Sequence, residues 1–124
     1  MTIYPAVAEV LAIHQRLIAE FGGAMGVCDM GALESALFRP QSGYYDDLIG
    51  EAAAMWESLS QNHPFVDGNK RVSITITAAF LSVNGWRLLF DDGEAYRFLL
   101  DHYESGTFRR SQLESWLRKH VEPI

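Results

Sequence analysis

Cysteine is almost absent from this sequence, because Cys28 is the only one among 124 residues. A single cysteine cannot form an internal disulfide bridge, so the fold depends on its core alone and a reducing compartment is expected. A chain of this length buries roughly two thirds of the surface that its unfolded state exposes, which is enough for such a core. We therefore interpret Cys28 as a small apolar residue.

Long hydrophobic runs are missing as well. No apolar stretch approaches the roughly 18 residues of a membrane-spanning helix. The start of the chain carries Glu9, Arg16 and Glu20 where a secretory signal would have a continuous apolar core. These absences predict a soluble, cytoplasmic protein with no membrane partner.

Positive charge is scarce too. Ten Lys and Arg residues against sixteen Asp and Glu residues give a net charge of −6, whereas proteins that hold a nucleic-acid backbone are usually basic. We therefore expect no direct nucleic-acid partner. Four cations lie within the last sixteen residues, where they suit either an acidic partner or the C-terminal end of a helix: Arg109, Arg110, Arg118 and Lys119.

Linkers, repeats and low-complexity segments are also lacking, which predicts one domain over residues 1–124. What the sequence does have is the apolar period of amphipathic helices. Pro5 opens a first helix that ends at Gly22, and His14 lies on its apolar face, so we expect a buried, hydrogen-bonded structural histidine. The other predicted helices run from the cap Asp29 to Phe38, over about 48–62, over about 69–84, from the cap Asp91 to near Gly106, and from the cap Ser111 through Val121.

The segment before Gly85 needs a choice, since residues 74–77 alternate as a strand would. Val72, Ile76 and Phe80 fit a helix better. Residues 39–50 read as an irregular or hairpin-like excursion, either a surface contact or a plain connection. The short stretch 86–90 reads as an extended connector. The sum is an all-α domain of about six helices around a central apolar helix, about 69–84.

The stretch HPFVDGNKR, residues 63–71, departs from this regular pattern. Lys70 and Arg71 open the helix that follows Gly68, although the partial positive charge of a helix N-terminus repels cations. A bound anion would remove the conflict, because backbone N–H groups after a glycine turn form an anion nest. Lysine would offer a phosphate a point charge, and arginine a bidentate fork.

Two further side chains complete the chemistry of this stretch. Asp67 would be a poor neighbour for a phosphate unless it holds Mg²⁺, which bridges carboxylates to phosphate oxygens. Pro64 ends the preceding helix and leaves His63 at the junction, where an imidazole can act as a general base near neutral pH. The combination predicts phosphoryl or nucleotidyl transfer.

Each of these residues also has a purely structural interpretation. Asp67 or Asn69 fits an N-cap, His63 fits a helix end, and the two cations fit a solvated surface. Their coincidence within nine residues favours a site. Both interpretations remain open from the residues alone.

The same nine residues resemble the signature of the Fic/Doc family, His-x-Phe-x-Asp/Glu-Gly/Ala-Asn-Gly/Lys-Arg, at every defined position. The glycine pair after the first helix and the stretch DMGALESAL are similar to the death-on-curing (Doc) toxins of type II toxin–antitoxin systems, and the resemblance covers most of the chain. It implies a compact helical fold with Phe65 as a buried anchor. The catalytic residues that it implies are His63 as base, Asp67 as Mg²⁺ ligand, Lys70 and Arg71, and the implied phosphate-binding residues are Gly68, Asn69, Lys70 and Arg71.

Two positions distinguish the branches of that family. Members that transfer AMP from ATP have glycine where this chain has Lys70, and a second arginine where it has Ile74. The Doc branch shares both departures, which implies a Mg²⁺ and ATP dependent Ser/Thr kinase that modifies elongation factor Tu and arrests translation. The alternatives are AMP transfer, a non-catalytic nucleotide or phosphate-binding module and, more weakly, a metal-dependent phosphodiesterase.

The resemblance also bears on control. Self-restrained Fic enzymes carry a glutamate followed by Gly or Asn, and no glutamate of this chain has such a neighbour. A separate Phd-type antitoxin is therefore implied, with a helical tail that covers the site. An acidic tail would suit the cations near the C-terminus, and residues 39–50 match the target-holding flap of Fic proteins in position.

Overall fold

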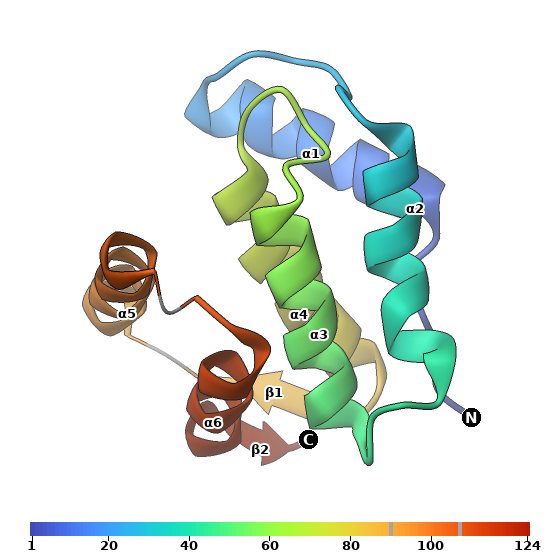
Figure 1. Ribbon diagram of the computed structural model, residues 1–124, viewed down its shortest axis with the longest axis vertical. Helices are drawn as coiled ribbons and strands as arrows, with labels where there is room; N and C mark the ends of the chain where they lie inside the picture. Colours follow the sequence, from blue (N-terminus) through green and yellow to red (C-terminus); the bar gives the residue numbers. More distant parts are fainter. Residues whose placement is uncertain (90, 107) are drawn as a thin grey trace.

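Helices make up most of the part of the chain that the structure describes. This computed structural model describes residues 1–89, 91–106 and 108–124, without the side chains of Asp92, Tyr96 and Tyr103. In chain order the elements are α1 (Val7–Phe21), α2 (Met30–Phe38), the 3₁₀ helix η1 (Arg39–Ser42), α3 (Leu48–Gln61), α4 (Asn69–Val83), β1 (Trp86–Leu88), α5 (Asp92–Ser105), α6 (Arg110–His120) and β2 (Val121–Pro123). The predicted all-α class is confirmed (Figure 1).

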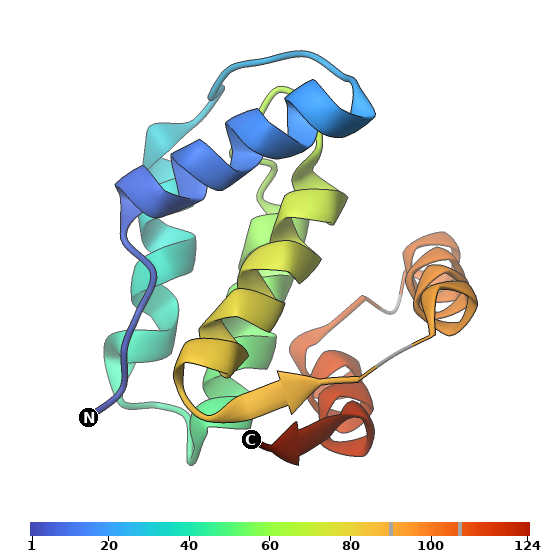
Figure 2. The ribbon, with the colours of Figure 1, turned by 180° about the vertical axis from the view of Figure 1, so that it is seen from behind.

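The core is built on α3 and α4, which lie side by side (Figures 1 and 2). Val72, Ile76 and Phe80 of α4 are buried, so the helical choice for that segment was right. The predicted central helix corresponds to α4, and α3 shares that position because it also contacts α2, η1 and α6. The α3 residues predicted to face inward are all buried: Ile49, Ala52, Ala53, Trp56, Leu59 and Ser60.

Arg39 ties the segment between α2 and α3 to the rest of the fold. Its guanidinium donates to the Tyr45 hydroxyl at 2.7 Å and to Glu57 Oε1 at 2.8 Å. At the end of the segment, Asp47 caps α3 by accepting from Gly50 N at 3.0 Å, and it binds both terminal nitrogens of Arg118 at 3.0 Å. The segment predicted to be irregular thus contains the short helix η1 and a loop, and hydrogen bonds at both ends hold it against the rest of the fold.

The pairing of Asp47 predicts an acid-dependent loss of stability. The hydrogen bonds from Arg118, followed by that from Gly50 N, lower the pKa of Asp47. A lowered pKa in the folded state stabilises the protein above the unfolded pKa of about 4, and this contribution disappears as the pH falls through the lower, folded value. Because the Asp47 side chain is 48% exposed, solvent screening limits the effect to about 0.2–1 kcal/mol.

The measurement is urea unfolding of wild type and Asp47→Asn at pH 7 and at pH 3. The variant should be less stable at pH 7, and the difference should shrink at pH 3. Asp46→Asn, at the exposed neighbouring position, is the matched control and should show no such pattern. An Asp47→Asn deficit of equal size at both pH values would contradict the prediction.

The C-terminal third contains two corrections. Asp91 caps α5 as predicted, since its Oδ1 accepts from Gly93 N and Glu94 N. Ser111 was the wrong cap for α6: the helix begins at Arg110, and Arg110 N donates to Glu57 Oε2 of α3 at 2.5 Å, so a tertiary partner replaces a local cap. Val121 is not helical, because it pairs with Leu88 in the antiparallel β1–β2 ladder.

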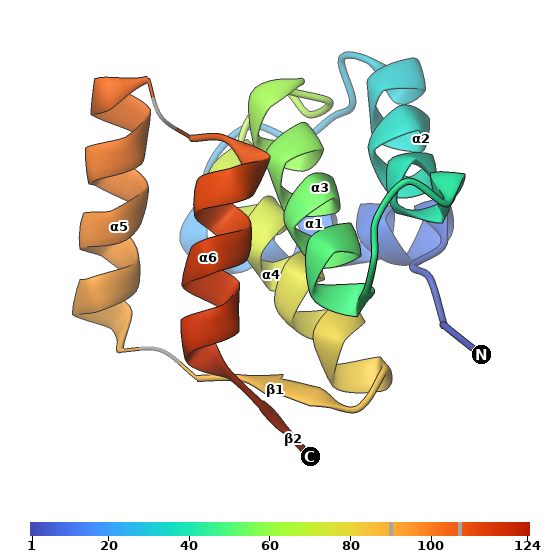
Figure 3. The same cartoon turned by 60° about the horizontal axis from the view of Figure 1, so that its bottom comes forward.

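The extended connector predicted at 86–90 contains the strand β1. Figure 3 shows α5 beside α6, on the side of α6 that faces away from α2. Within the described residues, every helix is too short or too polar to pass through a lipid bilayer.

Candidate functional site

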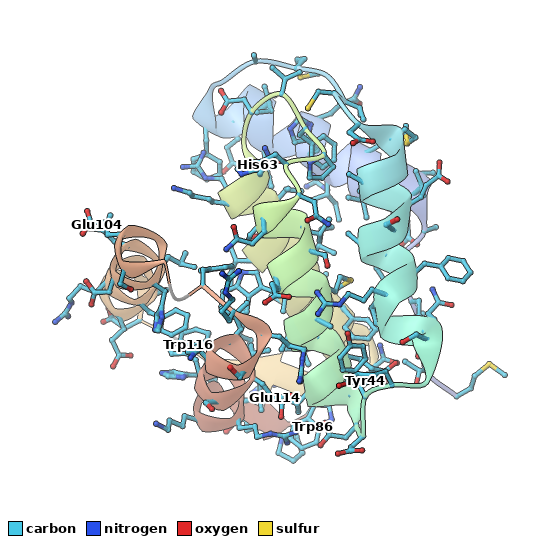
Figure 4. The ribbon with its side chains drawn as sticks, in the orientation of Figure 1. Tyr44, His63, Trp86, Glu104, Glu114 and Trp116 are labelled. Carbon is cyan, nitrogen blue, oxygen red and sulfur yellow. The ribbon has the colours of Figure 1, made fainter. Side chains whose placement is uncertain are left out.

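The loop between α3 and α4 carries the predicted site (Figure 4). As predicted, α3 ends at Gln61 and leaves His63 exposed at the junction, followed by the buried Pro64. His63 has a φ of 48°, a left-handed conformation that is uncommon for residues other than glycine. The surrounding contacts must therefore hold the backbone of His63 in this uncommon conformation.

Cys28 provides one of those contacts. Its thiol donates to the His63 carbonyl oxygen at 3.2 Å, and the residue is exposed. Its backbone N–H donates to Pro64 O at 2.9 Å. The interpretation of Cys28 as merely a small apolar residue was therefore wrong, because this residue fastens the backbone beside the imidazole.

Phe65 anchors the middle of the loop, as the resemblance implied. Its side chain is 1% exposed and its backbone forms a bridge with Val27. The Asn69 amide closes the turn from the other side: its oxygen accepts from Phe65 N at 3.0 Å and its nitrogen donates to Phe65 O at 2.9 Å. The Asn69 side chain thus acts structurally, and the backbone N–H of Asn69 is the first of α4.

The Asp67 carboxylate is held in one orientation by two backbone groups. Oδ1 accepts from Gly68 N at 2.9 Å, and Oδ2 accepts from Ala24 N at 3.2 Å. A Cβ at Gly23 would lie 2.8 Å from Oδ2, and Gly23 has a φ of +116°, so only glycine fits there. Each oxygen keeps a second lone pair, which leaves the exposed carboxylate able to bind a cation.

The start of α4 offers donors and positive charge. Gly68 is the N-cap residue with a φ of 78° and makes no side-chain cap hydrogen bond, so the first N–H groups of the helix have no acceptor within it. Lys70 and Arg71 are exposed at this end. The Arg71 guanidinium lies 4.2 Å from the centre of the Phe21 ring, a cation–π contact that holds it at the end of α1.

These residues surround one cavity of about 460 Å³. It is lined by His63, Val66, Asp67, Gly68, Asn69, Lys70 and Arg71. The structure therefore brings every sequence-predicted site residue to one place. One carboxylate beside backbone donors and two cations suits Mg²⁺, which keeps most of its waters. In the described chain no three His, Cys, Asp or Glu side chains gather into a metal cage.

The comparison with known families agrees with this geometry. Residues 4–81 match the model of the Fic/DOC family, which is more than half of the chain. The chain belongs to the Fic/DOC family.

Two curated relatives extend the comparison. The chain is 42% identical over 76 residues to a protein named Toxin Doc from Mycolicibacterium smegmatis, covering 57% of this chain and 58% of that relative's length. It is 32% identical over 90 residues to Protein kinase doc of Escherichia phage P1, covering 69% of this chain and 71% of the phage protein. The first match thus spans less than two thirds of the mycobacterial protein.

Around the Fic/DOC motif, the structure adds residues that the sequence argument did not assign to the site. Ala24 N holds Asp67, and Phe21 holds Arg71. His14 is 3% exposed, as predicted for a structural histidine, but its partner is the backbone of Asp67. The glycine pair and the position of His14 on the apolar stripe were visible signals, although neither identifies a partner.

Proposed function

We propose that this Fic/DOC protein is the toxin of a toxin–antitoxin pair. In this proposal it acts in the cytoplasm as a Mg²⁺ and ATP dependent kinase that phosphorylates a threonine or serine of elongation factor Tu. The observation that carries it is the cavity in which the His63 imidazole, the Asp67 carboxylate and the N-terminus of α4 meet. The names of the two relatives, a Doc toxin and a Doc protein kinase, support both parts of the proposal.

In the mechanism we propose, the oxygen of the target hydroxyl attacks the γ-phosphorus of ATP in line with the leaving β-phosphate oxygen. A new P–O bond forms to the target, the bond to ADP breaks, and His63 takes the hydroxyl proton. Mg²⁺ bound by Asp67 would neutralise the charge on the phosphate oxygens. The first N–H groups of α4, with Lys70 and Arg71, would hold the phosphates through charge-assisted hydrogen bonds.

Two positions support transfer of the phosphoryl group over transfer of AMP. Lys70 lines the cavity, and a side chain at this position takes up space that a glycine would leave for phosphates. Ile74 is half-buried and packs against the hydrophobic core. Unlike an arginine, it has no charged group that could bind the β- and γ-phosphates of a nucleotide. A nucleotide should therefore lie differently here than in a member with glycine and arginine at these positions.

A Phd-type antitoxin is the proposed partner. Two cations of α6 are already paired with carboxylates of this chain: Arg110 with Glu114 at 2.8 Å and Arg118 with Asp47 at 3.0 Å. They are therefore less available to an acidic antitoxin tail. An acidic tail that bound these two residues would have to replace internal carboxylates. Its contacts are better sought at the open cavity, where Lys70 and Arg71 are exposed.

The test is incubation of the purified protein with Mg²⁺, elongation factor Tu and ATP labelled at either the α or the γ phosphate. Label from the γ position in the factor, with none from the α position, is the expected result. Label from the α position would overturn the kinase in favour of AMP transfer. ATP binding without transfer of either label, to the factor or to any protein of a bacterial lysate, would favour a non-catalytic module.

A further inference from the structure

His14 lies outside the motif but contacts the site loop in two ways. It belongs to α1, which crosses the N-terminal end of α4 (Figure 2). Its ring stacks on Phe65 with 3.8 Å between ring centres and 9° between planes. Its Nε2 lies 2.7 Å from the Asp67 carbonyl oxygen. Because a carbonyl oxygen only accepts, Nε2 carries the hydrogen and donates it.

That carbonyl belongs to the peptide group between Asp67 and Gly68. The N–H of the same peptide donates to Asp67 Oδ1 at 2.9 Å, so the group is held at both ends. Gly68 has a φ of 78°, and glycine passes between left-handed and right-handed conformations at little cost. The backbone of Gly68 therefore does not by itself keep this peptide in place, and its position depends on the local bond to Oδ1 and on the contact from His14.

Helix α1 is close enough to provide that contact. A Cβ at Gly68 would lie 3.2 Å from Ile18 Cδ1 and 3.6 Å from His14 Nε2. Ile18 and His14 are both buried, so they form a fixed surface behind the turn. Rotation of the peptide would turn its N–H away from Oδ1 and release one of the two contacts that orient the carboxylate.

We propose that His14 is a positioning residue of this site. Its Nε2–H fixes the Asp67–Gly68 peptide, and through that peptide it sets the direction of the Asp67 carboxylate and of the first N–H groups of α4. The ring stack on Phe65 is a separate contribution to packing. The effect on Mg²⁺ and catalysis rests on the proposed kinase function, whereas the effect on the peptide does not.

Two substitutions separate the donor from the ring. His14→Phe keeps an aromatic ring against Phe65 and removes the donor. His14→Gln removes the ring and keeps an amide N–H₂ at a similar reach. With His14→Phe we expect a rise of about tenfold or more in the Mg²⁺ concentration that gives half-maximal phosphoryl transfer, as for partners that orient metal ligands. His14→Gln should stay near wild type in this measurement even where it unfolds more easily.

A second readout does not depend on activity. Hydrogen exchange of the Gly68 amide, followed by NMR under fully folded conditions, should be about tenfold faster in His14→Phe and nearly unchanged in His14→Gln. Equal exchange in wild type and His14→Phe would overturn the proposal, and so would losses in both variants that simply follow their stability. If wild type transfers no phosphate but the exchange pattern holds, the kinase proposal fails and the positioning of the peptide by His14 stands.

Discussion

Replacing His63 with alanine should reduce phosphoryl transfer by about 10²–10⁴-fold, the usual contribution of a positioned general base. The expected cause is the loss of the group that accepts the hydroxyl proton, since the substitution leaves Asp67 and the start of α4 in the sequence as they are. The exposed position of His63 means that no core packing is lost. The measurement is the initial rate of γ-label transfer at saturating Mg²⁺ and ATP.

A matched control is His102→Ala, which also removes a histidine but lies on α5, outside the cavity that contains His63. Its transfer rate should remain close to wild type. Urea unfolding of both variants shows whether either has lost its fold. A folded His63→Ala protein with an undiminished rate would remove His63 from the mechanism and leave the base to be found elsewhere.

Replacing Phe65 with alanine should cost about 3–5 kcal/mol of folding free energy, because a fully buried ring leaves a cavity that its surroundings fill only partly. Phe65 is 1% exposed, and its ring stacks on His14. A loss of this size is a large fraction of the stability of a domain such as this one. Transfer activity should fall as well, since the same ring anchors the loop that carries His63 and Asp67.

The measurement is equilibrium urea unfolding, with Phe38→Ala as the matched control. Phe38 is 70% exposed, so its loss should change stability by no more than about 0.5 kcal/mol. Phe65→Leu should lie between wild type and Phe65→Ala because it keeps most of the apolar volume. If Phe65→Ala were as stable as Phe38→Ala, the loop would not depend on this anchor.

The helices followed from local rules, and their errors have a common cause. The apolar period placed α3 and α4 within one residue of their observed ends, and Asp29 caps α2 as predicted. Ser111 failed as a cap because Glu57, more than fifty residues earlier in the chain, accepts the hydrogen bond from Arg110 N. Val121 was wrongly predicted to be helical because its backbone pairs with Leu88 in the β1–β2 ladder.

The site shows the same division. The motif suggested His63, Asp67, Lys70 and Arg71 as catalytic residues because of their types and spacing, and the structure places all four around one cavity. The motif also suggested that Asn69 helps to hold phosphates; its side chain is bonded to the backbone of Phe65, so the group it has for that proposed role is its backbone N–H, the first of α4. The residue types in a short stretch thus indicate a site. They do not tell which side chains face a ligand and which only hold the loop in shape.

By itself, the sequence determined the helical class, the core faces of α3 and α4, and the stretch that matches the Fic/DOC motif, because each depends on residues close together in the chain. Only the tertiary structure decided what orients that stretch. His14 reaches Asp67 across 53 positions and Ala24 reaches it across 43. Such contacts form only after helices have packed, since packing brings backbone groups within hydrogen-bonding distance at positions that no local pattern specifies.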